Sequence, residues 1–159
     1  MNNIYLLLGS NMGNSKSQLS KALSLIEKKI GPAKRSSGIY QTAAWGKTDQ
    51  RDFLNQVVIV DSKLTARDTM QTILGIEKKM GRVRTEKNAP RIIDIDILFF
   101  NKEVISEKDL SIPHPAIQLR RFVLVPLNDL SPNLKHPVLN KTVHQLLLLC
   151  PDKLDVKKI

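Results

Sequence analysis

The chain has 159 residues and a formal net charge of +10, because 25 Lys and Arg outnumber 15 Asp and Glu. This length and a hydrophobic content of 42% fit one globular domain over residues 1–159 and exclude a disordered chain. The apolar runs are too short to cross a membrane, and the single Cys150 excludes an internal disulfide, so we expect a cytoplasmic protein without membrane contact. The positive charge suggests a polyanionic partner, either nucleic acid or the phosphates of a nucleotide.

Strand and helix patterns alternate from the start of the chain. The hydrophobic pattern predicts a buried strand at residues 4–9, which ends in a Gly-Ser-Asn turn. An apolar stripe with helical spacing follows over residues 15–30. Ser15 and Gln18 have the spacing of a capping box, which predicts that the helix begins there. Residues 34–42 favour a second, weaker strand.

The same kinds of element recur after a polar loop at residues 43–51. Residues 53–60 are rich in β-branched side chains and predict a strand. Thr65 is the expected N-cap of a helix over residues 66–80, and residues 92–100 predict a third strong strand. The order β-α-β-β-α-β is typical of a ferredoxin-like α+β fold, in which helices pack on an antiparallel sheet.

The patterns are less regular beyond residue 102. We expect an edge strand, a proline-rich loop around residues 113–115 and a helix near residues 143–149. No segment repeats an earlier one, so these C-terminal elements add to the ferredoxin-like core of a single domain.

Two aspartates alternate with isoleucines in the third strong strand. Because successive strand side chains point to opposite faces, Asp94 and Asp96 share one face, and the isoleucines around them share the other. The two aspartate Cα atoms are then about 7 Å apart. Mg²⁺ commonly binds one or two carboxylates and takes its other ligands from water and phosphate, so the pair predicts a magnesium site. The alternative is the solvated face of an amphipathic strand, although Asp is uncommon in strands.

Three arginines, Arg82, Arg84 and Arg91, precede this strand. Guanidinium groups bind phosphate oxygens in bidentate fashion and keep their charge, so the arginines and aspartates together predict a site for phosphate and metal. The alternative is a structural network of ion pairs that also includes Glu77. This residue interrupts the apolar stripe of the preceding helix, and a buried carboxylate needs a partner. The two interpretations are compatible.

His114 lies between two prolines, in a loop that the prolines make rigid. A single histidine is more often a surface or capping residue than a catalytic one, and both roles stay open at this point. The sequence lacks a Walker A motif, a zinc motif of the CxxC or HExxH type and a Gly-x-Ser-x-Gly nucleophile elbow. No residue is therefore a candidate for covalent catalysis.

Five short motifs follow one another between about residues 4 and 127. They are Gly9-Ser10-Asn11, Asp52-Phe53-Leu54-Asn55, Gly81-Arg82-Val83-Arg84, Pro90-Arg91-Ile92-Ile93-Asp94-Ile95-Asp96-Ile97-Leu98 and Ile112-Pro113-His114-Pro115. In this order they resemble the 6-hydroxymethyl-7,8-dihydropterin pyrophosphokinase family of folate biosynthesis. The fourth motif is highly specific, whereas the first alone would be a weak signal.

The resemblance implies an enzyme with a ferredoxin-like core that transfers pyrophosphate from ATP to the hydroxymethyl group of the reduced pterin, giving AMP. It implies that Asp94 and Asp96 bind two Mg²⁺ ions together with ATP. Arg82 and Arg91 would be the catalytic arginines. The predicted ATP-binding residues are Glu77, Arg82, Arg84, Arg91, His114 and Arg120.

The resemblance also implies a pocket in which two phenyl rings sandwich the pterin and an amide forms a hydrogen bond with it. The predicted substrate-binding residues are Thr42, Ala43, Trp45, Phe53, Asn55 and Phe122. Many relatives carry an aromatic residue shortly before the Pro-Arg pair, but this chain has Lys87-Asn88-Ala89 there. Trp45 is our candidate to replace that aromatic residue.

Two other functions stay open on the sequence. A nucleic-acid-binding module on a ferredoxin-like sheet suits the charge, but such sheets stack bases on aromatic side chains, and only 4% of this chain is aromatic. The other is a metal-dependent phosphotransferase with a different acceptor. We expect ATP and 6-hydroxymethyl-7,8-dihydropterin as ligands, no nucleic-acid partner and a monomeric protein.

Overall fold

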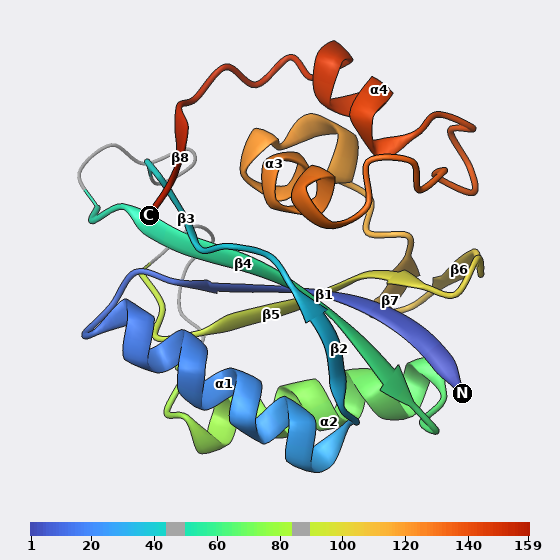
Figure 1. Cartoon of the computed structure of the whole chain (residues 1–159). Helices are drawn as coiled ribbons and strands as arrows, with labels where there is room; N and C mark the ends of the chain where they lie inside the picture. Colours follow the sequence, from blue (N-terminus) through green and yellow to red (C-terminus); the bar gives the residue numbers. More distant parts are fainter. Residues whose placement is uncertain (44–49, 84–89) are drawn as a thin grey trace.

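The computed structural model describes residues 1–43, 50–83 and 90–159 (Figure 1). These residues form a six-stranded antiparallel sheet in the order β5-β1-β4-β3-β8, and β2 also pairs with β4. The strands are β1 (Asn2–Ser10), β2 (Ala33–Ser36), β3 (Tyr40–Thr42), β4 (Phe53–Ser62), β5 (Asp94–Phe100) and β8 (Val156–Lys158). With β1 and β4 at the centre, this order confirms the predicted ferredoxin-like α+β core.

Two helices, α1 (Ser15–Lys29) and α2 (Ala66–Lys79), pack on one face of the sheet. Every second residue of the central strands points to this face, so the alternating apolar positions of the sequence meet the apolar stripes of the helices. The strand residues in this core include Ile4, Leu6, Leu8, Val58, Val60, Ile95 and Ile97.

The starts of the two helices differ in how well the sequence predicts them. Thr65 caps α2 as predicted, because its side chain accepts a hydrogen bond from Asp68 N. The N-cap of α1 is Asn14, whose side chain accepts from Ser17 N, so the prediction that Ser15 is the cap is wrong by one residue. Asn and Ser are equally good caps, and the capping-box spacing alone does not choose between them.

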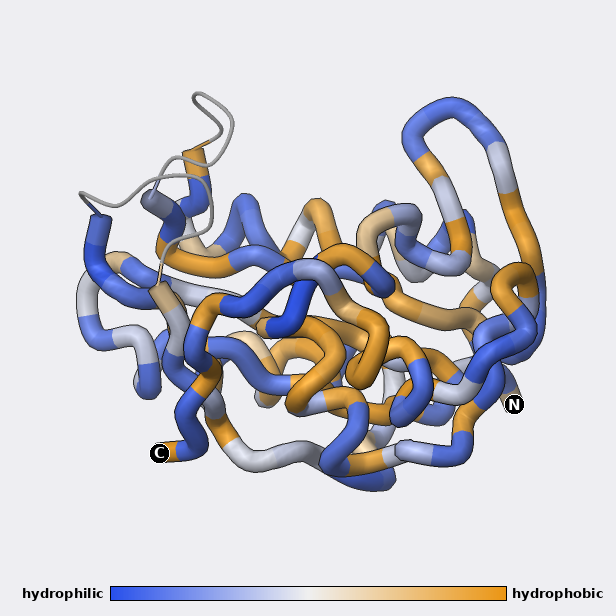
Figure 2. Tube along the Cα trace, turned by 90° about the horizontal axis from the view of Figure 1, so that it is seen from above, coloured by the Kyte–Doolittle hydropathy of each residue, from blue (hydrophilic) through white to orange (hydrophobic). Residues whose placement is uncertain are grey.

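The opposite face carries α3 (Arg121–Leu130) and α4 (Val143–Leu149), preceded by the 3₁₀ turn η1 (Ile117–Leu119). Seen from the side of these helices, the centre of the molecule is mainly hydrophobic and its outer turns are mainly hydrophilic (Figure 2). The strand residues buried on this face are Tyr5, Leu7, Val57, Ile59, Leu98 and Phe99.

The sequence pattern predicts α4 but not α3. Pro126 lies inside α3, where it contributes no N–H to the helix, and proline normally signals the end of a helical pattern. Burial overrides this local signal, because Val123, Leu124 and Leu127 all pack into the core.

The second strand and the C-terminal strands also differ from the prediction. Residues 34–42 lie in two short strands, β2 and β3, and between them Ser37 Oγ accepts a hydrogen bond from Val57 N. Beyond residue 102, β8 pairs with β3 and is the expected edge strand, whereas the separate hairpin of β6 (Ile105–Glu107) and β7 (Leu110–Ile112) is not predicted. Within the described ranges, no helix is long and apolar enough to cross a membrane.

A bulge in β5 sets the register of the acidic residues. Phe99 pairs with Tyr5 but Ile97 pairs with Leu6, so Leu98 is an extra residue in β5. Beyond the bulge the regular alternation of β5 resumes toward its start, where the two aspartates lie.

Candidate active site

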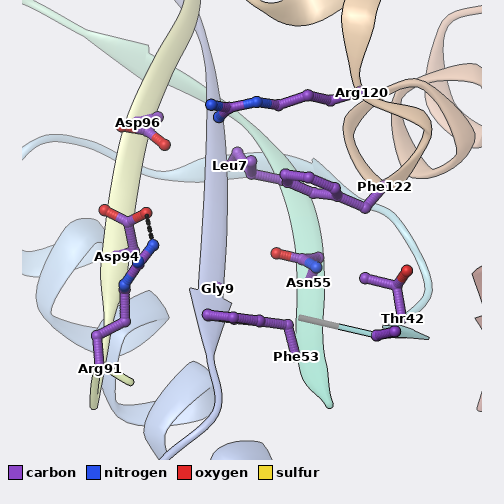
Figure 3. Close-up of a pocket in the computed structure, with 11 residues that line it drawn as sticks. Leu7, Gly9, Thr42, Phe53, Asn55, Arg91, Asp94, Asp96, Arg120 and Phe122 are labelled. Atoms are coloured by element: carbon purple, nitrogen blue, oxygen red, sulfur yellow. Dashed lines mark hydrogen bonds and ion pairs between the residues drawn. The ribbon is translucent and has the colours of Figure 1, made fainter. Parts of the chain in front are cut away.

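A cleft opens on the same sheet face as α3, beside the start of that helix (Figure 3). It encloses about 560 Å³, including its open mouth. Residues of β1, β4 and β5 form its floor, and the end of β3 and the start of α3 form its walls. The lining residues are Leu7, Gly9, Thr42, Ala43, Phe53, Asn55, Arg91, Asp94, Asp96, Arg120 and Phe122. All of them except Leu7 and Gly9 are site residues that the sequence predicts.

Gly9 keeps the floor of the cleft open. In the strand register it lies between Asn55 of β4 and Asp94 of β5. A Cβ at this position would lie 2.7 Å from Asn55 Oδ1, so any side chain here would displace that amide. Asn55 is only 3% exposed, and its Nδ2 has no hydrogen-bond partner among the described residues. An unsatisfied buried donor costs about 1–3 kcal/mol, so the floor of the cleft presents a donor that a polar ligand would satisfy.

A network of acids and arginines lies along β5. Arg82 Nη1 donates to Asp94 Oδ1 (2.7 Å) and to Glu77 Oε2 (2.9 Å). Arg91 Nη1 donates to Asp94 Oδ2 (3.2 Å). Glu77 Oε2 also accepts from the backbone N–H of Ile95 (2.8 Å), which ties α2 to β5. The buried Glu77 thus has the arginine partner that the sequence predicts, and the structural ion-pair network is present at the predicted phosphate site.

The charges of this network act on one another. Burial disfavours the guanidinium charge of Arg82, but the carboxylates of Asp94 and Glu77 outweigh it and raise the pKa of Arg82. Burial, followed by the charges of Asp94 and Glu77, raises the pKa of Asp96 to about 7. Arg120 and Arg82 oppose this shift without cancelling it, and Figure 3 shows Arg120 reaching across β1 toward Asp96. The two arginines therefore do not fully offset burial and the neighbouring carboxylates, so a bound cation would stabilise the ionised form of Asp96.

The carboxylates suit Mg²⁺ in number and type. Asp94 and Asp96 lie on the same face of β5, as the alternation of the strand predicts. Across residues 1–43, 50–83 and 90–159, no three His, Cys, Asp or Glu side chains are grouped so as to hold a metal ion by themselves. Mg²⁺ needs no such group, because it commonly takes one or two carboxylates and completes its shell with water and phosphate oxygens. The two aspartates therefore fit this ion when a phosphate ligand is also bound.

Two aromatic rings lie on either side of Asn55 in Figure 3: Phe53 at the start of β4 and Phe122 in the first turn of α3. The guanidinium of Arg91 lies 5.2 Å from the centre of the Phe53 ring, and that of Arg120 lies 5.8 Å from the centre of the Phe122 ring. Two half-buried rings beside an unsatisfied amide suit a flat heterocycle with polar edges.

A second cavity, of about 740 Å³ including its open mouth, lies between α2, β5 and the hairpin of β6 and β7. Its lining residues are Met70, Ile73, Leu74, Glu77, Ile95, Asp96, Ile97, Asp109, Leu110, Ser111, His114 and Pro115. Asp96 lines both this cavity and the cleft, so the two compartments adjoin at the acidic end of β5.

His114 has a local structural role and also lines this second cavity. The ring Nδ1 of His114 accepts a hydrogen bond from Ala116 N (3.1 Å). The backbone N–H of His114 donates to the carbonyl of Leu98 (3.0 Å). Burial and the charge of Arg120 lower the pKa of His114. Because Nδ1 accepts a hydrogen bond, the neutral form of the ring carries its proton on Nε2, where it can donate to a ligand.

Asn11 ties together the two segments that flank the cleft. It is 2% exposed, its Oδ1 accepts from Arg91 N (2.9 Å), and its Nδ2 donates to Gln50 Oε1 and to the carbonyl of Arg51 (both 3.1 Å). The sequence predicts only a turn at Asn11, and this bridging role is not predicted. A polar amide directly after a buried strand, inside a family motif, was the available signal.

Some predicted residues lie outside the described ranges, and some cavity residues are not predicted. Trp45 and Arg84 lie outside the described residues, as does the stretch of residues 87–89. Apart from Glu77, the residues of α2 and β7 that line the second cavity are not predicted from the sequence. They are ordinary apolar and small polar residues without a pattern of their own, so only the packing of α2 beside the hairpin reveals them.

The chain matches known proteins over most of its length. The sequence model of the family "7,8-dihydro-6-hydroxymethylpterin-pyrophosphokinase (HPPK)" matches residues 5–132. The 2-amino-4-hydroxy-6-hydroxymethyldihydropteridine pyrophosphokinase of Aquifex aeolicus is 38% identical over 145 residues, covering 91% of this chain and 90% of that protein. The protein of the same name from Pseudomonas aeruginosa is 36% identical over 151 residues, covering 93% of this chain and 91% of its own length.

Longer proteins contain a similar region. Folic acid synthesis protein FOL1 of Dictyostelium discoideum is 37% identical over 151 residues, and this chain spans 23% of its length. The crystal structure of wild-type HPPK-DHPS from Plasmodium falciparum superimposes with a TM-score of 0.78 at 23% identity, covering 93% of this chain and 44% of that one. At that identity the likeness supports the fold alone.

Proposed function

The chain belongs to the 7,8-dihydro-6-hydroxymethylpterin-pyrophosphokinase family, and we propose that its two adjoining cavities carry out that family's reaction. The enzyme transfers pyrophosphate from ATP to the hydroxymethyl group of 6-hydroxymethyl-7,8-dihydropterin in folate biosynthesis. The hydroxymethyl oxygen attacks the β-phosphorus of ATP and the bond from that phosphorus to the α,β-bridging oxygen breaks. AMP leaves, and the hydroxyl proton passes to solvent.

The cleft is the proposed pterin site. Phe53 and Phe122 would hold the flat ring system between them, which is worth about 0.5–1.5 kcal/mol per aromatic pair beyond the burial of area. The unpartnered Nδ2 of Asn55 would donate to an acceptor on the ring edge. The backbone at Thr42 and Ala43 would close the side of the pocket.

The second cavity is the proposed site for the nucleoside of ATP, with the triphosphate reaching toward Asp96. His114 and Glu77 line that cavity, and Arg120 and Arg91 line the cleft on the far side of Asp96. The triphosphate would therefore lie between the arginines, where its oxygens can accept from their N–H groups. Arg82, held between Glu77 and Asp94, fixes the carboxylate nearest the reacting phosphates.

Asp94 and Asp96 would hold two Mg²⁺ ions, which when bound neutralise phosphate charge. The chain's own contribution is to position the reactants and exclude water. Phosphoryl transfer leaves the protein little covalent work, so orientation and fixed positive charge account for most of the catalysis. This agrees with the absence of a nucleophile motif in the sequence.

One observation carries the proposal: Asp96 lines both a cleft with an aromatic pair and a second, larger cavity. The test is to incubate the protein with Mg²⁺, ATP and 6-hydroxymethyl-7,8-dihydropterin and to separate the nucleotides. AMP in equal amount to the pterin diphosphate is the expected result. Formation of ADP would mean transfer of a single phosphate, and no nucleotide turnover would mean that the assigned acceptor is wrong.

The proposal extends to the state of the enzyme in the cell. We place all of residues 1–159 in one domain that acts as a monomer in the cytoplasm. Size-exclusion chromatography with light scattering under assay conditions tests the monomer directly.

A further inference from the structure

The first turn of α3 is held from outside the helix. Arg120 is the N-cap of α3, but it forms no side-chain cap hydrogen bond. Instead, the backbone N–H of Arg121 donates to Asp152 Oδ2 (3.1 Å), which lies 31 residues further along the chain. A carboxylate at the start of a helix satisfies a free N–H and also interacts favourably with the helix dipole.

Hydrogen bonds within the helix close this turn only in part: Val123 N and Leu124 N both donate to the carbonyl of Arg120 (3.1 and 3.2 Å). Phe122 is half-buried in the cleft, whereas the next residues, Val123 and Leu124, are 3% and 0% exposed and anchor the helix in the core. In a regular helix residue 126 would donate to the carbonyl of Phe122, but Pro126 has no N–H. The hydrogen bond from Arg121 to Asp152 adds a restraint from outside the helix to the turn that carries Phe122.

The same C-terminal segment holds the opposite wall of the cleft. Thr42 Oγ1 donates to the backbone carbonyl of Asp155 (3.1 Å), and Val156 of β8 pairs with Thr42 of β3. Asp152 Oδ1 accepts from Leu154 N (3.0 Å), which fixes the turn that leads into β8. Figure 1 shows this segment running from α4 past α3 to the edge of β3. It therefore connects both walls of the cleft.

We propose that Asp152 is a positioning residue for the acceptor substrate: it holds the first turn of α3 so that Phe122 stays across the cleft from Phe53. Asp152 is not among the described residues that line either cavity, so it acts through Phe122. The nucleotide side is expected to depend on it less. The backbone N–H of Arg120 donates to the carbonyl of the buried Ile117 in η1, which restrains Arg120 independently of Asp152. This inference rests on the proposed function for the identity of the acceptor.

The test compares Asp152→Ala with wild type in steady-state assays. The loss of an N-cap predicts that the KM for 6-hydroxymethyl-7,8-dihydropterin rises about tenfold. The kcat and the KM for ATP should stay within about twofold of wild type, since the interaction lost is one of acceptor binding. Calorimetric titration of the pterin into protein with Mg²⁺ and α,β-methylene-ATP should show the same loss of affinity.

Two further variants separate capping from charge and from folding. Asp152→Asn keeps one acceptor oxygen, and Asn is an equally good cap, so its pterin KM should lie closer to wild type than that of Asp152→Ala. Asp155→Ala removes the same charge from the same segment at a side chain that is 74% exposed, and it leaves the carbonyl bonded to Thr42 in place. Its kinetics should match wild type. If the alanine variant at 152 does not fold, the asparagine variant still provides the comparison.

A readout independent of catalysis is the hydrogen exchange of the Arg121 amide, measured by NMR. Exchange should be faster in Asp152→Ala than in wild type. In Asp152→Asn it should be slower than in Asp152→Ala. The inference is wrong if Asp152→Ala leaves the pterin KM unchanged, raises both KM values equally or only lowers the melting temperature. A wild-type enzyme that forms no AMP would refute the proposed function instead, and the exchange rates would still show whether Asp152 holds the turn.

Discussion

The two ends of one sheet face have opposite characters, although the same three strands build both. In the order β1, β4 and β5, the packed end carries Tyr5, Ile59 and Phe99, and the open end carries Gly9, Asn55 and Asp96. At the packed end, the Phe99 ring meets the Tyr5 ring edge-on at 5.8 Å and the His136 ring at 5.7 Å, beneath α3 and α4. At the open end, the amide donor of Asn55 lacks a partner among the described residues, and the carboxylate of Asp96 has a raised pKa.

The difference shows how the protein separates stability from function along each strand. Burial of apolar area and close packing stabilise the covered end. The open end keeps buried polar groups that a ligand would satisfy, and these groups lower the stability of the unliganded protein. Substitutions at the open end should therefore change activity more than stability, and substitutions at the packed end should do the reverse.

The largest expected effect is that of Asp96→Ala at the open end. Loss of a group that organises charge in the transition state typically lowers turnover about 10²–10³-fold, and we expect at least this loss of Mg²⁺-dependent AMP formation. Initial rates measured against Mg²⁺ concentration provide the test. A variant with the metal dependence of wild type would show that Asp96 does not belong to the metal site.

The second effect concerns Arg82, which holds Asp94 and Glu77. Arg82→Ala should lower kcat by about 10²-fold while ATP still binds, because the arginine orders the acidic side of the site. Turnover and equilibrium binding of ATP are measured on the same preparation. Arg67→Ala is the matched control, because Arg67 lies at the start of α2, forms an exposed ion pair with Glu107 and lines neither cavity. Near-normal turnover in Arg82→Ala would contradict the role assigned to it.

The third effect is a pH dependence of stability. The pKa of Asp96 rises from 3.8 to about 7 on folding, so between these values the folded protein keeps a proton that the unfolded chain has lost. Its contribution to the free energy of unfolding therefore falls as the pH rises from about 4 to 7. Asp96→Asn should raise the melting temperature of the metal-free protein at pH 8, by about 2–4 °C for each kcal/mol gained in the free energy of unfolding. The same substitution should have little effect at pH 4.

Thermal melts in EDTA at a series of pH values measure this difference. Added Mg²⁺ with a non-hydrolysable ATP analogue should then stabilise wild type more than Asp96→Asn. If the two proteins differ by the same amount at pH 4 and pH 8, Asp96 is not the group that loses its proton in this range.

The smallest effect is expected at the packed end of the same strand. Phe99→Leu keeps most of the buried volume but loses both ring contacts, which should lower the free energy of unfolding by about 1–2 kcal/mol. Both KM values and kcat should match wild type at a temperature where the variant is folded. Urea denaturation and steady-state kinetics on one preparation distinguish this result from a direct effect on the cleft.

The sequence by itself determined the features that depend on near neighbours in the chain. Strand and helix periods placed the ferredoxin-like core, put Asp94 and Asp96 on one face and turned Glu77 inward, and all three predictions are confirmed. They hold because backbone geometry sets the side-chain direction within a few residues.

Only the tertiary structure decided which distant groups meet. Packing allows α3 to form although it contains Pro126. Contacts between distant segments pair β8 with β3 and place Asp152 at the amide of Arg121. The tertiary structure also joins two cavities at Asp96. Each of these contacts links segments far apart in the chain, and their partners are selected by packing and by the need to satisfy buried polar groups, which no local pattern encodes.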